Sequence, residues 1–223
     1  AEWSPGEVPG IATLLWYDYL ATHDESVKQR ALAIVESVLC ESGPDGLTAS
    51  GACHILKWEL PFYFGHVEAG LECIKETIQS LIESQEDDGG WCSRPITEDS
   101  KDLGQDGGTD FGTCAHSALM LFKHARITGD QESLNAGVKA LSVMDRFTVP
   151  RGGIQASASS LKTPNLLAAA HGVGAYVEAY TITGEKHFLE RAEYWAKTGL
   201  PFLYHWHFTD RPAMRFASIP VFG

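Results

Sequence analysis

Three histidines occur in similar short stretches of the chain, and imidazole is the side chain best suited to proton transfer near neutral pH. His54, His116 and His171 lie in the segments ACHI, CAHS and AAHG. His116 and His171 each precede by 12 residues the threonine of a TGD or TGE sequence. This spacing predicts equivalent positions in a repeated unit. Such a histidine could remove a carbon-bound proton as a general base, or it could be a hydrogen-bonding residue of the core.

Carboxylates offer a second kind of chemistry. Asp88 precedes, and Asp106 lies within, a stretch of 16 residues (93–108) without helical periodicity, and Asp110 follows it. An aperiodic stretch of this length is typical of a binding loop or a lid. Two carboxylates across a glycosidic bond, one of them with a raised pKa, can hydrolyse it. The structural alternatives are a helix cap for Asp110 and a solvated turn around Asp88.

Other residues near these carboxylates could bind a sugar. Trp91 could stack on the apolar face of a sugar ring, and His54 is a further candidate for binding the substrate. Arg151 could hold a substrate carboxylate. The alternative for Trp91 is a plug between helices.

Cysteines and histidines raise the alternative of a zinc site. Cys53 and His54, Cys92, and Cys114 and His116 could supply thiolates and imidazoles to the ion. Buried cysteines are more often small apolar residues, so the expectation is a chain without a cofactor, with zinc as the alternative.

The elements that must position these residues are helices arranged in hairpins. The sequence ITGD that ends at Asp130 returns as ITGE ending at Glu185. Gly129 and Gly184 can adopt the left-handed conformation that ends one helix, and the acidic residue then begins the next. Apolar residues flank both copies at steps of three or four: Phe111, Ala115, Ala118, Phe122 and Ala125, then Leu134, Val138, Leu141 and Met144; and Leu166, Ala170, Val173, Val177 and Tyr180, then Leu189, Ala192 and Ala196.

Weaker copies of the hairpin occur earlier, at ATHD ending at Asp24 and around Gly65. Each connection between hairpins places glycine before a large apolar residue, in GPDGL (43–47), DDGGW (87–91) and PRGGI (150–154). No good strand alternation is found outside short loops. The sequence therefore predicts an all-α protein of about four helical hairpins.

Leu81, Gln85 and the Gly-Gly-Trp ending at Trp91 resemble the QW motif of terpenoid cyclases, whose fold is an α/α toroid. The TGD and TGE hairpins with Gly-Gly-aromatic connections resemble the six-hairpin glycosidases and related α/α-toroid polysaccharide lyases and sugar epimerases. The resemblance implies that residues 1–223 form a single α/α-toroid domain or part of one. Such rings hold more hairpins, so we expect either a longer natural chain or another chain that covers the open side; the alternative is a compact four-hairpin domain.

If the first helix of each hairpin lies in an inner ring, His54, His116 and His171 converge on one mouth of a funnel, and the connections open onto the same face. The resulting expectation is a carbohydrate-active enzyme, first a glycoside hydrolase using Asp110, Asp106 or Asp88. The alternatives are a polysaccharide lyase or sugar epimerase with His116 or His171 as base, and a non-catalytic helical-repeat binding module.

Composition limits the partners. The formal net charge is −12, with 17 Lys and Arg and no basic run, which argues against nucleic acid. No apolar stretch of about 18 residues occurs, so no membrane partner is expected. Five cysteines, an odd number without a CxxC, slightly favour a cytoplasmic, reducing compartment and leave secretion open. The expected partner is a carbohydrate substrate, with an oligomer or a missing remainder of the chain as further expectations.

Overall fold

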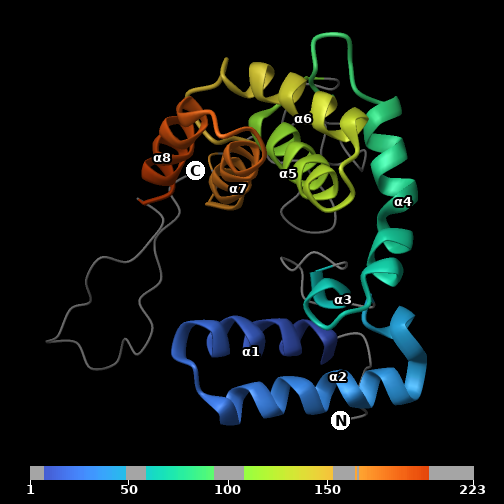
Figure 1. Cartoon of the computed structure of the whole chain (residues 1–223). Coiled ribbons are helices and arrows are strands. Elements are labelled where there is room, and N and C mark those ends of the chain that lie inside the picture. The colour runs from blue at the N-terminus through green and yellow to red at the C-terminus, as the bar shows by residue number, and fades with distance from the viewer. Residues whose placement is uncertain (1–7, 49–58, 93–107, 153–163, 165, 201–223) are drawn as a thin grey trace, which may run out of the picture. The chain divides into compact units, whose positions relative to one another are not determined.

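The computed structural model describes residues 8–48, 59–92, 108–152, 164 and 166–200. Within these ranges the chain is all-helical, as the sequence predicts, and the extended segments form isolated bridges rather than strands (Figure 1). The helices are α1 (Val8–Thr22), α2 (Glu25–Gly46), α3 (Glu59–Tyr63), α4 (Val67–Glu83), α5 (Phe111–Thr128), α6 (Gln131–Met144), α7 (Leu166–Thr183) and α8 (Lys186–Gly199).

The chain divides into two compact units, Ala1–Thr77 and Ile78–Gly223, and the division falls within α4. The first unit contains the hairpin α1–α2 and the short α3; the second contains the hairpins α5–α6 and α7–α8. Three helical hairpins are therefore present in the described residues. A fourth hairpin around Gly65, the arrangement of the hairpins as a repeat and their closure into a single toroid remain predictions.

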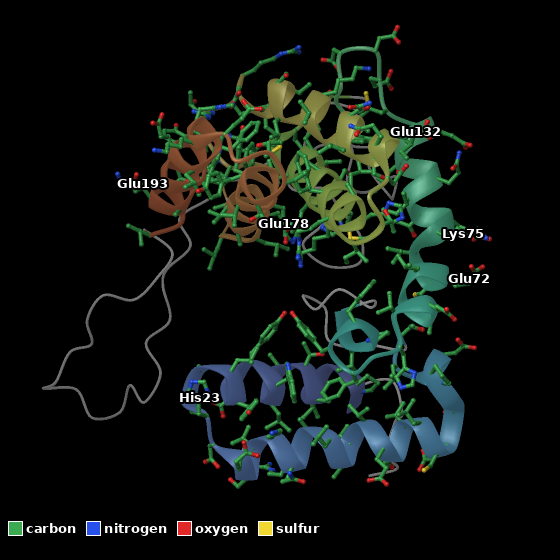
Figure 2. All side chains as sticks on the ribbon, in the orientation of Figure 1. His23, Glu72, Lys75, Glu132, Glu178 and Glu193 are labelled. Atoms are coloured by element: carbon green, nitrogen blue, oxygen red, sulfur yellow. The ribbon has the colours of Figure 1, made fainter. Side chains whose placement is uncertain are left out.

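The same turn joins the two helices of each of these hairpins. His23, Gly129 and Gly184 have φ angles of 57°, 76° and 73°. Their N–H groups donate to carbonyls four residues earlier, at 2.7, 2.8 and 2.8 Å. This bond ends the first helix in the left-handed conformation, which glycine adopts without the steric cost that a Cβ brings. Figure 2 labels His23 at the turn after α1. The glycine prediction is confirmed, and the first hairpin makes the same turn with a histidine.

A threonine stabilises all three turns, and its role was not predicted from the sequence. The hydroxyls of Thr22, Thr128 and Thr183 donate to carbonyls four residues earlier, at 2.8, 2.7 and 2.9 Å. The same oxygens accept the N–H of the residue two positions later, at 3.3, 3.2 and 3.2 Å. The hydroxyl thus satisfies a helix-terminal carbonyl and an N–H that begins the next helix.

The acidic residue after each turn lies at the N-cap of the second helix. Asp24 accepts the N–H of Ser26, and Asp130 accepts those of Glu132 and Ser133. Bonds to Ser26 and Ser133 hold the pKa of these two aspartates below the usual value. Glu185 occupies the same position and makes no side-chain capping bond. The longer glutamate side chain is not among the preferred N-cap residues.

The first unit has a small core between its helices. Ala12 of α1, Val35 and Val38 of α2, Leu47 and Leu60 are buried together, and α3 packs against α1. Gly43 has a φ of 67° and interrupts the helical backbone of α2 shortly before the fully buried Leu47. This connection therefore turns the chain at glycine and buries the apolar residue that follows.

In the second unit α5 is the central helix, with α6 and α7 packed against it and α8 packed against α7 (Figure 1). Glycines allow α6 and α7 to approach α5 closely. A Cβ on Gly172 of α7 would lie 2.5 Å from Cζ of Phe111, and one on Gly137 of α6 would lie 2.9 Å from Cε1 of Phe122. An ion pair also joins α5 to α7, because Nε of Arg126 lies 2.6 Å from Oε2 of Glu178, which Figure 2 labels.

The buried faces of α6, α7 and α8 agree only in part with those that the apolar spacing predicts. Leu141, Met144 and Ala192 are buried as predicted. The predicted residues Val138, Leu166, Val177 and Leu189 are 39–40% exposed. Small residues form much of the buried faces instead, because they allow helix backbones to approach closely. The buried residues are Ser133, Ala136, Gly137, Ala140, Leu141, Val143 and Met144 of α6; Ala168, Ala169, Gly172, Ala175, Tyr176 and Ala179 of α7; and Phe188, Ala192, Trp195 and Gly199 of α8.

The turn that follows α4 packs against α6. Gly89 has a φ of 100°, and a Cβ there would lie 2.6 Å from the carbonyl oxygen of Lys139. The amide of Gln85 donates to the carbonyls of Gly89 and Ala136, at 3.0 and 2.8 Å. The glutamine of the QW-like segment thus joins its own turn to a neighbouring helix. No helix of the described residues is long and apolar enough to span a bilayer.

Candidate functional site

The first helices of the two hairpins in the second unit begin at the same place. Cys92 pairs with Thr109 just before α5, and Arg151 pairs with Pro164 just before α7, each as an isolated antiparallel bridge. The N–H of Gly112, in the first turn of α5, donates to the carbonyl of Arg151 at 2.8 Å. Both connections therefore reach the N-terminal ends of these helices, as the hairpin geometry predicts.

His116 and His171 lie together at this end. Their ring centroids are 4.7 Å apart and the ring planes are inclined by 48°. Their equal spacing from the hairpin threonines thus corresponds to a real juxtaposition across the α5–α7 contact. Among the described residues, the structure thus brings these two predicted site residues into direct contact.

His116 is exposed on a helix whose neighbouring residues are mostly buried. From Phe111 to Phe122 the residues of α5 are buried, apart from the partly exposed Thr113 and the exposed His116. The imidazole reaches solvent while protein surrounds much of it, and this desolvation lowers its pKa. A lowered pKa keeps the ring neutral at pH 7, and a neutral imidazole can accept a proton or bind a metal.

Asp110 has the structure of a helix cap. Its backbone is extended, its Oδ1 accepts the N–H of Thr113 at 2.8 Å, and the residue is 3% exposed. Gly152 packs directly on its carboxylate, and a Cβ there would overlap Cγ and Oδ1. These contacts favour the capping interpretation, because a buried carboxylate in contact with backbone has little room for a substrate oxygen.

Asp88 forms a structural turn. Its Oδ1 accepts the N–H of Gly90 at 2.9 Å, and its Oδ2 pairs with Nη1 of Arg146 at 2.8 Å. The bond from Gly90 and the guanidinium of Arg146 lower the pKa of Asp88. A general acid in glycoside hydrolysis needs the opposite shift, so Asp88 does not suit that role.

Trp91 is 5% exposed, and its indole N–H donates to the carbonyl of Leu81 at 2.9 Å. This burial favours the plug over a platform for a sugar ring. Arg151 lies in the connection before α7, and its carbonyl accepts the N–H of Gly112 in the first turn of α5. The residue itself is exposed. His54 and Asp106 lie outside the described residues.

The zinc alternative gains little from the described cysteines. Burial raises the pKa of the Cys114 thiol to about 12, which opposes the thiolate that zinc requires. Among the residues that the structure describes, no group of three or more His, Cys, Asp and Glu side chains could hold a metal ion. Cys53 lies outside the described ranges.

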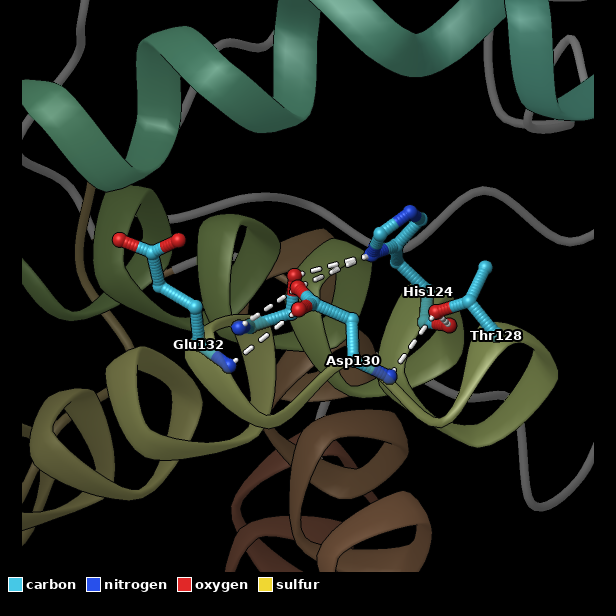
Figure 3. Close-up of polar contacts among 5 residues, drawn as sticks. His124, Thr128, Asp130 and Glu132 are labelled. Carbon is cyan, nitrogen blue, oxygen red and sulfur yellow. Dashed lines mark hydrogen bonds and ion pairs between the residues drawn. The ribbon is translucent and has the colours of Figure 1, made fainter.

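A Ser-His-Asp cluster near the α5–α6 turn was not anticipated (Figure 3). Nδ1 of His124 lies 2.9 Å from the Ser133 hydroxyl and 3.7 Å from Oδ2 of Asp130. In a catalytic triad the serine and the aspartate contact different imidazole nitrogens, whereas here both face Nδ1. Ser133 is also fully buried, so the cluster supports the turn rather than a nucleophile.

A second polar cluster also joins residues distant in sequence. Oδ1 of Asp145 accepts a bond from the Tyr176 hydroxyl at 2.6 Å and one from Nε of Arg191 at 2.7 Å. The cluster connects the end of α6 to α7 and α8. No local spacing indicates it, because its members are 31 and 46 residues apart.

No protein-family model, curated protein or solved structure matches the chain. Function must therefore be inferred from the residues themselves. Among the predicted site residues, His116 is accessible and lies beside His171, and this pair has the geometry that best suits a functional site.

Proposed function

We propose that the chain is a carbohydrate-active enzyme of α/α-toroid type that uses His116 and His171 for proton transfer, and that it is a polysaccharide lyase. The observation that carries the proposal is the contact between the two imidazoles at the start of α5 and α7, with ring centroids 4.7 Å apart. The carboxylates expected for hydrolysis give less support, since Asp110 caps a helix and Asp88 is held in an ion pair.

The reaction suited to such a pair is β-elimination on a uronate. A neutral imidazole removes the proton from the carbon next to the sugar carboxylate. The neighbouring carbon–oxygen bond then breaks and a carbon–carbon double bond forms. The departing oxygen takes up a proton from the imidazolium formed in the first step, which returns the imidazole to its neutral form. Arg151, which is accessible near this end, is a candidate for binding the carboxylate and stabilising the charge that develops on it.

The separation of the rings favours a lyase over an epimerase. An epimerase with two bases holds the sugar carbon between them. The two reacting nitrogens must then lie about 7 Å apart, because each side requires a carbon contact of about 3.5–4.0 Å, and the ring centres lie farther apart still. At 4.7 Å the rings leave no such room. Both imidazoles therefore act from one face of the sugar, as in an elimination whose proton acceptor and proton donor share a face.

The test is a panel of uronate polysaccharides assayed by the ultraviolet absorbance of the new double bond. General base catalysis contributes about 10²–10⁴-fold, so His116→Asn and His171→Asn should each lower kcat by about that factor. His187→Asn, at a largely exposed histidine of α8, is the matched control. New reducing ends without absorbance would indicate hydrolysis instead, and full activity in folded His116→Asn and His171→Asn proteins would rule out the proposed roles.

A further inference from the structure

The contact between α5 and α7 fixes the two imidazoles in a defined relationship. Gly172 packs on the ring of Phe111, and a Cβ on Gly174 would meet the Leu119 side chain at 3.1 Å. Phe111 and Leu119 lie on either side of His116 in sequence, and Gly172 and Gly174 closely follow His171. The rings are therefore held by packed helices, which position ligands better than loops do.

The separation of the rings matches that of two imidazoles bound to one metal ion. A ligating imidazole nitrogen lies about 2.0–2.1 Å from such an ion, which places each ring centre about 3.2 Å from it. Two rings bound at a right angle would have centres about 4.5 Å apart, and two bound at the tetrahedral angle about 5.2 Å apart. The observed 4.7 Å lies between these limits.

The inclination of the rings is also suitable. The lone pair of an imidazole nitrogen lies in the ring plane, so two parallel stacked rings cannot direct their lone pairs at one point. The planes of His116 and His171 are inclined by 48°, which allows the lone pairs to converge.

We propose that His116 and His171 form a two-imidazole binding site for a divalent first-row transition metal ion. The described residues provide no third ligand in a group with these two. Water or a ligand oxygen would complete the coordination, and the bound ion would exchange readily. Affinity should rise from Co²⁺ through Ni²⁺ to Cu²⁺, as it does for nitrogen ligands in general.

Metal binding would hold whether or not the chain cleaves polysaccharides, because it needs only the geometry of the two rings. If the lyase proposal also holds, a bound ion would occupy the lone pairs that accept the substrate proton. The same metal would then inhibit the enzyme, with binding and inhibition lost together in the same variants.

The test is calorimetric titration of the metal-free protein with Ni²⁺, after its accessible thiols have been alkylated to remove competing ligands. One site per chain is expected. His116→Asn and His171→Asn should each weaken it at least tenfold, and the double variant should bind no better than either. His187→Asn is the control and should bind Ni²⁺ like the unchanged protein.

Thermal unfolding gives a second measurement. Ni²⁺ should raise the Tm of the unchanged protein and of the control, but not that of either site variant, since a ligand stabilises only the state that binds it. Three results would overturn the proposal: no binding at millimolar Ni²⁺, unchanged binding in both site variants, or a loss in only one of them, which would indicate a site with a single histidine.

Discussion

Gly172 of α7 lies so close to the ring of Phe111 that a Cβ would come within 2.5 Å of Cζ. Phe111 cannot easily move away, because its other contacts include a stacked Trp195 at a centroid separation of 3.7 Å. This packing sets the distance between α5 and α7, and with it the separation of His116 and His171. The candidate site therefore requires glycine, which has no side chain, at position 172.

Gly172→Ala should destabilise the protein even though alanine is the better helix former. The gain in helix propensity is about 1 kcal/mol, and forcing a methyl group into a packed core costs about 1–3 kcal/mol. We expect a net loss of about 1 kcal/mol in the free energy of unfolding, measured with urea. Gly174→Ala is the matched control, because its Cβ would meet only the flexible Leu119 side chain at 3.1 Å. Equal stability of the two variants would contradict this account of the contact.

Substitutions at equivalent positions of the hairpin turns should change the free energy of unfolding in opposite directions. Gly129→Ala and Gly184→Ala should each lower stability by about 1 kcal/mol, because both glycines are left-handed and no atom lies near enough to compensate. His23→Gly should raise it by up to about 1 kcal/mol, since it relieves the same strain in the first hairpin. Urea unfolding measures all three, and a loss of stability in His23→Gly would show that the turns are not equivalent.

These turns also show how far the sequence predicts the fold. Gly129 and Asp130 are predictable because their roles depend on neighbours within a few residues, and the pairing of His116 with His171 follows from the repeat. The buried face of α7 was mispredicted, because the spacing of large residues such as Leu166 and Val177 does not indicate a contact made by glycine and alanine. The bond between Asp145 and Tyr176 depends on tertiary structure and has no local signature.

Asp110 permits a test that separates capping from catalysis. Asp110→Ala should cost about 1–2 kcal/mol of stability, because the Thr113 N–H at the start of α5 loses its acceptor. Asp110→Asn retains an acceptor oxygen and should lose less. If Asp110 only caps the helix, the asparagine variant keeps its activity at temperatures where it is folded. If Asp110→Asn instead lowered kcat a hundredfold or more without loss of stability, Asp110 would have a catalytic role, and hydrolysis would be favoured.

The histidines make stability depend on pH in a defined window. Burial lowers the pKa of both His116 and His124 in the folded protein, and an unfolded histidine has a pKa of about 6.5. Below that pH the unfolded chain binds protons that the folded protein binds less readily, so the free energy of unfolding should fall as the pH is lowered from about 7 to 5. Asp130, whose pKa is lowered, acts in a separate window, and its contribution is lost only as the pH falls below about 4.

Urea unfolding at several pH values measures this dependence, and replacing one histidine at a time apportions it. His124→Gln should flatten the slope between pH 7 and 5, and it should also cost about 1 kcal/mol at pH 7 through loss of the bond to Ser133. A free energy of unfolding that rises as the pH is lowered through this range would mean that the folded protein binds the extra protons, and the neutral imidazole required of His116 as base or metal ligand would then be wrong.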